Sequence, residues 1–147
     1  MRTLYNVIGL SLGILLISSC VRKNETIEPA APPQGGKGGH VTLAVTAQHH
    51  EKNLTDARIF IKYASTTAPA DTMGYDEARD VGVVNGRPGV VFDSLKQGDY
   101  YIFALGQDDS VIGNRFNLYG GATYKVVDTL HKTYDVYIAI NNELHHK

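Results

Sequence analysis

The chain has 147 residues and nearly balanced charge, because 14 Lys and Arg residues against 15 Asp and Glu residues give a net charge of −1 at pH 7. This length suits one ordinary domain with short additional segments, and no basic patch is present to favour nucleic-acid binding. The single cysteine excludes an internal disulfide, so a packed core has to stabilise the domain.

The N-terminus has the features of a secretory signal peptide, which we expect to span 1–19. Arg2 supplies a positive charge, an apolar run extends from Val7 to Ile17, and two small serine residues follow it. This order of charged, apolar and small residues is typical of secretory signals. The apolar run is shorter than the about 20 residues that a membrane-spanning helix needs, so a transmembrane helix is not expected here.

The only cysteine follows this run. The stretch Ile17-Ser18-Ser19-Cys20 resembles the lipobox of bacterial lipoproteins. The resemblance implies that a lipid is attached to the sulfur of Cys20, and that cleavage leaves Cys20 as the first mature residue. A cysteine thiolate is readily alkylated, and two or more acyl chains hold a protein stably on a bilayer. We therefore expect a protein of the cell envelope, anchored by lipid to a bacterial membrane on its periplasmic face or at the cell surface.

The segment 20–39 is rich in Pro, Gly and small polar residues and has no hydrophobic period. Such a composition predicts a flexible linker between the lipid and the domain. Glycines can also cradle a phosphate, but Gly35-Gly36-Lys37-Gly38-Gly39 is followed neither by Ser or Thr nor by a helical pattern. A nucleotide-binding loop is therefore disfavoured.

From His40 onward, apolar and polar residues alternate with the period of two that predicts β-strands, and no window predicts an amphipathic helix of ordinary length. Asn85-Gly86 is a strong hairpin signal. The expected strands lie near 41–47, 58–63, 81–83, 90–92, 100–105, 124–127 and 134–140. We therefore predict an all-β fold, a single seven-strand immunoglobulin-like β-sandwich over 40–141, followed by a tail over 142–147.

One short element points to a more specific fold. The stretch from Phe92 to Tyr100 has the pattern F-x-x-L-x-x-G-x-Y, which resembles an element of prealbumin-like sandwiches, including carboxypeptidase regulatory-like and Cna-B-like domains. We expect Leu95 to plug the end of the sandwich, Gly98 to form a turn and Tyr100 to re-enter the core. The chain lacks the terminal Tyr-Arg-Gly-Ser of transthyretin-related hydrolases and has no lysine in 40–50 for a Cna-B-type cross-link, so neither property is implied.

The six histidines include two adjacent pairs. Counting strands up and down places six possible ligands at one rim of the sandwich, where imidazole and carboxylate groups would suit copper or zinc. These candidate metal ligands are His49, His50, Asp108, Asp109, His145 and His146. The opposite rim is expected to hold His40, His131 and the 66–78 loop. The alternative is solvated loop charge, since adjacent residues on a strand face opposite sides.

The long stretch 63–79 is the other candidate site, since a loop of this length is uncommon in a compact domain. Tyr75 could stack on a sugar and Asp76 could hydrogen-bond it, as part of a carbohydrate- or peptide-binding surface that uses the loops 66–78 and 107–121. The alternative is a plain crossover between the sheets.

Taken together, these features predict a lipid-anchored envelope β-sandwich that acts as a non-enzymatic binding or accessory module, with an envelope protein or a glycan as its partner. No catalytic set of Ser, His and Asp or of Cys and His can be assembled, so an enzyme is not expected. Two alternatives remain open, a copper- or zinc-binding lipoprotein and a carbohydrate- or peptide-binding module. No other cofactor is expected.

Overall fold

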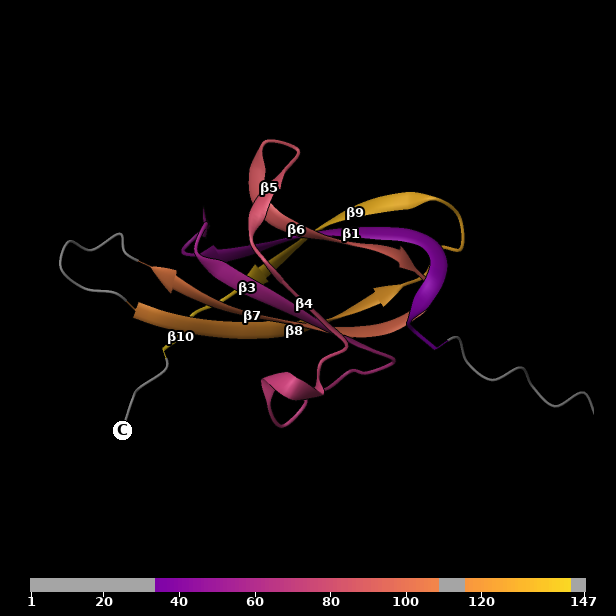
Figure 1. Ribbon diagram of the computed structural model, residues 1–147, viewed down its shortest axis with the longest axis horizontal. Coiled ribbons are helices and arrows are strands. Elements are labelled where there is room, and N and C mark those ends of the chain that lie inside the picture. Colours follow the sequence, from indigo (N-terminus) through magenta and orange to yellow (C-terminus); the bar gives the residue numbers. More distant parts are fainter. Residues whose placement is uncertain (1–33, 109–115, 144–147) are drawn as a thin grey trace, which may run out of the picture. The chain divides into compact units, whose positions relative to one another are not determined.

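A computed structural model describes residues 34–108 and 116–143 of the chain. The expected all-β fold is confirmed, because these residues form two packed β-sheets and no α-helix (Figure 1). The strands are β1 (Lys37–His49), β2 (Lys52–Asn53), β3 (Ala57–Tyr63), β4 (Glu77–Asp80), β5 (Gly82–Val84), β6 (Arg87–Leu95), β7 (Gly98–Asp108), β8 (Phe116–Val126), β9 (Lys132–Ala139) and β10 (Asn142–Glu143), with a 3-10 turn, η1, at Thr72–Gly74.

The first sheet, called sheet I, is built around β1. Strand β6 pairs antiparallel with β1, placing Leu43 opposite Phe92, and β9 pairs parallel with β1 from Val41 to Gln48. The short strand β2 pairs with the end of β1, and β5 pairs with β6. Parallel neighbours need a long connection, and here nearly the whole domain separates β1 from β9 along the chain.

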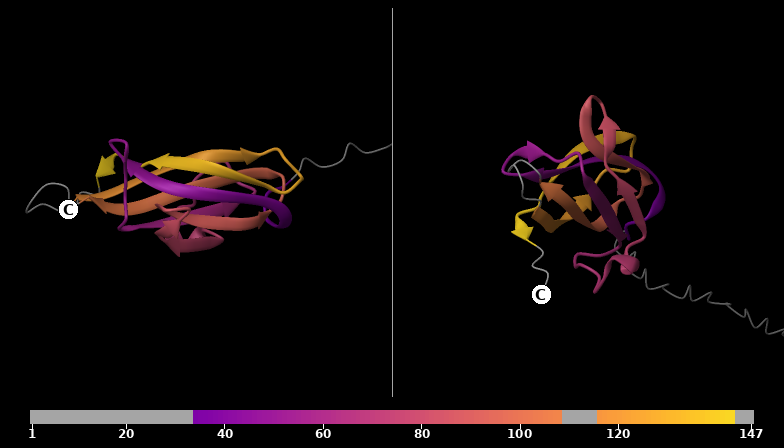
Figure 2. Two further views of the ribbon diagram at one scale, coloured as in Figure 1. Left: turned by 90° about the horizontal axis from the view of Figure 1, so that it is seen from above. Right: turned by 60° about the vertical axis from the view of Figure 1, so that its left-hand side comes forward.

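The second sheet, called sheet II, is antiparallel throughout and has the order β10-β8-β7-β3-β4. Its central strand β7 pairs with β3, where Phe103 lies opposite Phe60, and with β8, where Ile102 lies opposite Ala122. This position explains why the sequence of β7 is apolar on both faces. Sheet II packs against sheet I in two layers (Figure 2).

The core lies between the two sheets and follows the alternation predicted from the sequence. Val136 and Ile138 are buried as expected, with 7% and 2% exposure, while Tyr137 between them is exposed. The core cluster comprises Val41, Leu43, Val45, Ala47, Leu54, Ile59, Ile61, Val90, Phe92, Leu95, Tyr100, Ile102, Ala104, Leu118, Val126, Val136, Ile138 and Ile140. Since both sheets contribute to one cluster, they form a single cooperative core.

The Phe92–Tyr100 element closes one end of this core. Phe92, Leu95 and Tyr100 are all fully buried, and Gly98 has a φ of 145°, a conformation that favours glycine. The Tyr100 hydroxyl donates to the carbonyl of Lys96 at 2.6 Å and accepts from the N–H of Gly36 at 2.9 Å. The buried phenol therefore ties the corner between β6 and β7 to the start of the described chain.

The sandwich begins earlier than expected. The sequence analysis places 34–39 in a flexible linker, but β1 starts at Lys37, and the Lys96 N–H donates to the Gly36 carbonyl at 2.8 Å. Glycine is needed here for close approach, because a Cβ on Gly35 would lie 2.4 Å from the Asp99 carbonyl oxygen. The linker prediction is therefore wrong for 34–39, where the small glycine residues allow the chain to pack against the turn between β6 and β7.

The hairpin signal is confirmed, since Asn85 and Gly86 connect β5 to β6 with φ values of 50° and 77°. Ten strands replace the seven expected ones in the described residues, and β8 starts at Phe116, within the stretch 107–121 that the sequence analysis assigns to a loop. Gly120 and Gly121 lie inside this strand, and a Cβ on Gly120 would lie 2.1 Å from the Ala139 carbonyl oxygen. These two glycines allow close strand packing.

Candidate functional site

One end of the core is closed by a histidine and an aspartate from opposite sheets. His49 ends β1 and Asp108 ends β7, and the strand alternation turns both side chains inward. Their side chains are only 15% and 10% exposed, and His49 Nε2 lies 3.8 Å from Asp108 Oδ2. The predicted proximity of these two residues is therefore present in the fold.

The orientation of the His49 ring is fixed by the last strand. His49 Nδ1 lies 3.0 Å from the carbonyl oxygen of Ile140 and 3.3 Å from Asn141 Oδ1. A carbonyl oxygen only accepts hydrogen bonds, so Nδ1 holds the proton and Nε2 is the atom turned toward Asp108. A histidine held in this way presents a defined nitrogen to a ligand or to a carboxylate.

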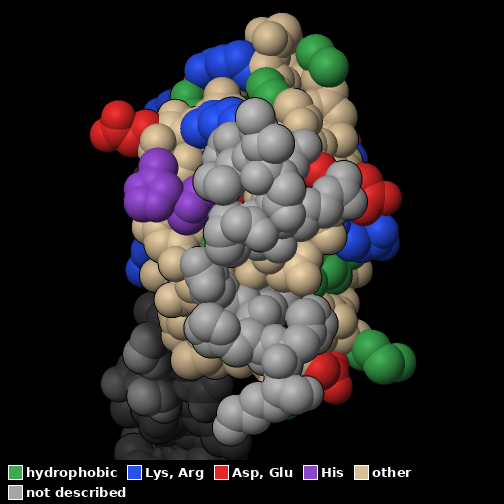
Figure 3. All heavy atoms as spheres, turned by 90° about the vertical axis from the view of Figure 1, so that its left-hand side faces the viewer, with side chains coloured by type: hydrophobic (Ala, Val, Ile, Leu, Met, Phe, Trp, Pro, Cys, Tyr) green, Lys and Arg blue, Asp and Glu red, His purple; other side chains and the backbone are tan. Residues whose placement is uncertain are grey.

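His50 begins the turn after β1 with a φ of 46°, and its ring lies edge-on to the His49 ring at 4.1 Å between centroids. Figure 3 looks onto this end of the molecule, where histidine side chains gather at one margin. Among the described residues, no three His, Cys, Asp or Glu side chains are grouped to hold a metal. The predicted ligands Asp109, His145 and His146 lie outside those residues, so metal binding stays a prediction.

The long loop lies in a different place from the expected one. His40 and His131 do meet at the opposite end, with ring centroids 4.6 Å apart. The 66–78 stretch, however, folds against the outer face of sheet II, where the Tyr75 ring stacks on Phe103 at 5.8 Å. The prediction that this loop lies at the rim is therefore wrong, because an aromatic contact draws it over the sheet.

Tyr75 and Asp76, the candidate ligand residues, both hold the loop in this position. The Asp76 carboxylate accepts the backbone N–H of Tyr63 at 2.6 Å and a hydrogen bond from Lys62 Nζ at 3.1 Å. Burial raises the pKa of Tyr75 to about 12, with a smaller contribution from Tyr101. The observed contacts of these two residues are internal, and their role in ligand binding stays a prediction.

Tyr75 belongs to an aromatic cluster on the outer face of sheet II. Phe60, Phe103 and Tyr119 come from three different strands, with ring centroids 6.0 Å apart for Phe60 and Phe103 and 6.3 Å apart for Phe103 and Tyr119. Phe60 is buried beneath the loop, but Phe103 and Tyr119 remain partly exposed. The sequence analysis did not identify this surface, because Phe60 and Phe103 fall in two expected strands and Tyr119 falls in the separate stretch 107–121.

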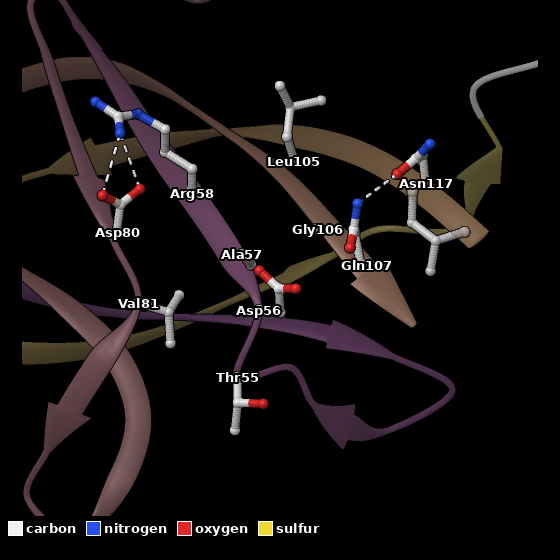
Figure 4. Close-up of a pocket in the computed structure, with 11 residues that line it drawn as sticks. Thr55, Asp56, Ala57, Arg58, Asp80, Val81, Leu105, Gly106, Gln107 and Asn117 are labelled. Carbon is white, nitrogen blue, oxygen red and sulfur yellow. Dashed lines mark hydrogen bonds and ion pairs between the residues drawn. The ribbon is translucent and has the colours of Figure 1, made fainter. Parts of the chain in front are cut away.

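A hollow of about 500 Å³ lies over the end of sheet II where β7 ends, and Figure 4 shows the residues that line it. One of them, Arg58, lies 5.9 Å from the centre of the Phe60 ring, so the hollow adjoins the aromatic cluster. Arg58 is paired with Asp80 at 2.9 Å, and the Gln107 amide nitrogen donates to Asn117 Oδ1 at 3.0 Å. Leu105 adds an apolar wall. The hollow therefore combines hydrogen-bonding groups with apolar surface, as small-molecule sites commonly do.

The hollow could not be located from the sequence because its residues are far apart in the chain. Arg58 comes from β3, Asp80 from β4, Gln107 from β7 and Asn117 from β8. The only local signal was the partial overlap of the last two with the stretch 107–121. Pairing of β7 with β8, which places Gln107 opposite Asn117, brings the two amides together.

Comparisons with other proteins identify neither a family nor a function for this chain. Within residues 34–108 and 116–143, no helix is long and apolar enough to cross a membrane. No protein-family model, no curated protein and no solved structure matches this chain.

Proposed function

We propose that this protein is a lipid-anchored envelope lipoprotein whose β-sandwich is a non-enzymatic binding module, and that its ligand is a carbohydrate held on the outer face of sheet II. The lipobox-like stretch ending at Cys20 supports the anchor. The observation that carries the binding assignment is the hollow of about 500 Å³ beside partly exposed aromatic rings.

The chemistry of this surface suits a sugar. The apolar face of a sugar ring can stack on an aromatic side chain such as Tyr119, while its hydroxyl groups hydrogen-bond to amides and charged groups. Gln107 and Asn117 provide amide groups, and Arg58 provides guanidinium N–H donors. Arg58 is paired with Asp80, and Asp56 adds a second carboxylate to the lining, so the hollow disfavours an anionic ligand and is compatible with a neutral sugar.

For the fold, we propose a prealbumin-like member of the immunoglobulin-like sandwiches. The support is the corner from Phe92 to Tyr100, in which the apolar residues are buried and the tyrosine hydroxyl bonds back to a carbonyl four residues earlier. A related tyrosine contact stabilises corners in immunoglobulin-like domains.

A glycan array followed by titration calorimetry tests the binding assignment. We expect the wild-type protein to bind at least one envelope polysaccharide, and Tyr119→Ala and Gln107→Ala each to weaken binding by about tenfold or more. Tyr137→Ala, on the outer face of sheet I, is the matched control and should bind like wild type. Binding of peptides but no glycans would refute the carbohydrate assignment, and equal loss in Tyr137→Ala would place the ligand elsewhere.

A transition-metal site is the second candidate function, and the favouring observation is the inward-facing pair of His49 and Asp108. The ring of His49 is oriented by the Ile140 carbonyl, the arrangement that commonly positions a metal-binding imidazole. A complete site would require further ligands, for which the predicted candidates are His50, Asp109, His145 and His146. Copper and zinc are the metals that suit such a set.

Calorimetry with Cu²⁺ and Zn²⁺ tests this second candidate. A folded site predicts loss of binding both in His49→Ala/His50→Ala and in His145→Ala/His146→Ala, because each variant removes imidazole ligands. If only the second variant loses binding, the tail is a loose chelator. If wild type does not bind, the metal hypothesis is wrong.

A further inference from the structure

Exposed apolar side chains gather at the turn between β8 and β9. Of the five exposed large hydrophobic residues in the described chain, Val127 and Leu130 both lie in this turn, with 59% and 76% of their surface exposed. The others, Met73, Val83 and Tyr137, lie in three separate segments. Single exposed apolar residues are ordinary, whereas two at one turn form a local apolar tip.

This turn lies at the end of the sandwich where the described chain begins (Figure 2). The Gln97 amide nitrogen donates to the Val127 carbonyl at 2.9 Å, which ties the turn to the corner between β6 and β7. The same corner binds Gly36, and the rings of His40 and His131 lie 4.6 Å apart. The chain start and the apolar tip are therefore fixed to one end of the domain.

The length of the preceding chain limits how far this end of the domain can lie from a lipid attached at Cys20. The segment 21–33 joins Cys20 to the first described residue, Gln34, and even fully extended it reaches no farther than about 50 Å. Since Gly36 is bonded to the domain, no part of the chain after it lengthens the tether. A lipid at Cys20 thus allows this end of the domain, to which the tether is joined, to reach the bilayer.

We propose that the β8–β9 turn contacts the surface of the bilayer that holds the anchor, with Val127 and Leu130 entering the headgroup region. This inference rests on the lipid anchor proposed above. Two apolar side chains would bind a vesicle weakly from solution, but tethering gives the turn a high effective concentration at the surface. In this proposal the lipid attaches the protein to the bilayer, and the contact made by the β8–β9 turn orients the domain on the bilayer surface.

The charges around the tip add a smaller electrostatic contribution to the apolar contact. Lys132 is paired with Asp128 at 3.1 Å, while Lys96 and His40 line the neighbouring hollow. We therefore expect the contact to form on zwitterionic vesicles and to be strengthened by anionic lipid at low salt. The carbohydrate hollow lies at the opposite end of the sandwich, so this orientation would turn it away from the bilayer.

The chain contains no tryptophan, which allows a single reporter to be introduced. Leu130→Trp is made in the full chain, processed in a bacterial membrane system and reconstituted in vesicles of zwitterionic and anionic phospholipid. Val83→Trp, in the β5–β6 hairpin with 83% exposure, is the matched control. Detergent partition first establishes that both proteins are anchored.

The expected result is a blue-shifted emission for Trp at position 130 and its quenching by lipids brominated near the glycerol backbone, with neither effect at position 83. An anchored protein with solvent-like, unquenched emission at position 130 would overturn the contact but leave the anchor intact. A blue shift without quenching would mean that protein covers the turn, and it too would overturn the proposal. A protein that does not partition into detergent would refute the anchor and the contact together.

Discussion

Single side chains decide how the two sheets fit together. The alternation of β9 turns Val136 and Ile138 into the core, and a shift of one residue would replace them with Asp135 and Tyr137. Polar residues act at the ends of the same core. Tyr100 bonds to backbone at one end, and His49 faces Asp108 at the other. Apolar contacts alone tolerate rearrangement, whereas a buried polar group is stable only when it meets its hydrogen-bond partner. Such groups therefore favour one arrangement of the core.

Ile138→Ala should lower the free energy of unfolding by about 2–5 kcal/mol, because the removed atoms leave a cavity at a site that is only 2% exposed. Thr133→Ala, at an exposed position of the same strand, should cost less than about 1 kcal/mol. Urea denaturation of both variants measures the difference. Equal losses would contradict the observed strand phase.

Tyr75 should make stability dependent on alkaline pH. Burial raises the pKa of its phenol from 10.0 to about 12, so the folded protein keeps this proton after the unfolded chain has lost it. The stabilisation is therefore complete below pH 10 and is lost as the pH rises through 12. Tyr75→Phe should show a shallower loss than wild type in urea titrations across this window.

Other partly or fully buried tyrosines also contribute to the loss of stability at high pH. Burial also raises the pKa of Tyr100 and of Tyr124, so some loss of stability at high pH should remain in Tyr75→Phe. Tyr137→Phe, which removes an exposed phenol, is the control and should follow wild type. Identical slopes in all three proteins would show that the Tyr75 contact with Phe103 does not bury the ring in solution.

The turns between strands determine which sheet each strand joins and how closely neighbouring strands pack. The β5–β6 hairpin uses Asn85 and Gly86 with positive φ values, which matches the twist of the flanking strands. Between β4 and β5 the chain passes from sheet II to sheet I, since β4 pairs with β3 and β5 pairs with β6. The turn before β7 is more crowded, because Gly98 lies against Gly35 from the chain start.

Gly98→Ala should be strongly destabilising. Its φ of 145° disfavours a side chain, and an added Cβ would lie 2.1 Å from the backbone nitrogen of Gly35. We expect a loss of at least about 1–3 kcal/mol in the free energy of unfolding. Gly82→Ala is the control, since its Cβ would meet no atom within 4 Å, and a comparable loss there would refute the crowding explanation.

At the scale of the whole molecule, the two ends of the sandwich differ. One end holds the chain start, the Phe92–Tyr100 corner and the exposed turn with Leu130. The other holds the inward-facing pair of His49 and Asp108, with the hollow of sheet II nearby. This polarity suits a protein that is attached at one end and presents a binding surface at the other.

Cys20→Ala should abolish lipid attachment at the proposed site. We expect an uncleaved or mislocalised precursor in place of a mature protein that partitions into detergent, because no other cysteine can accept the lipid. Immunoblotting of membrane and soluble fractions, with mass spectrometry of the N-terminus, measures both properties. Processing and membrane association like those of wild type would refute the lipoprotein assignment.

The sequence by itself determined the features that depend on local pattern. Period-two alternation predicts the all-β class and the inward positions of Val136 and Ile138, and Asn85-Gly86 predicts the hairpin, because each signal lies within a few neighbouring residues. The count of seven expected strands also predicts that His49 and Asp108 share one end, since it assumes that each expected strand runs opposite to the one before it. The lipobox-like stretch is local in the same sense, and its consequences remain predictions.

Only the tertiary structure decided which distant segments touch. The packing of Gly35 and Gly36 at the chain start depends on Gly98 and Tyr100, and the position of Tyr75 over sheet II depends on Phe103. The hollow exists because four strands bring their polar residues to one place. A glycine in the sequence can indicate either a flexible segment or a close contact between two backbones, because both favour a residue without a side chain. Which of the two applies depends on whether another segment of the chain packs against that glycine.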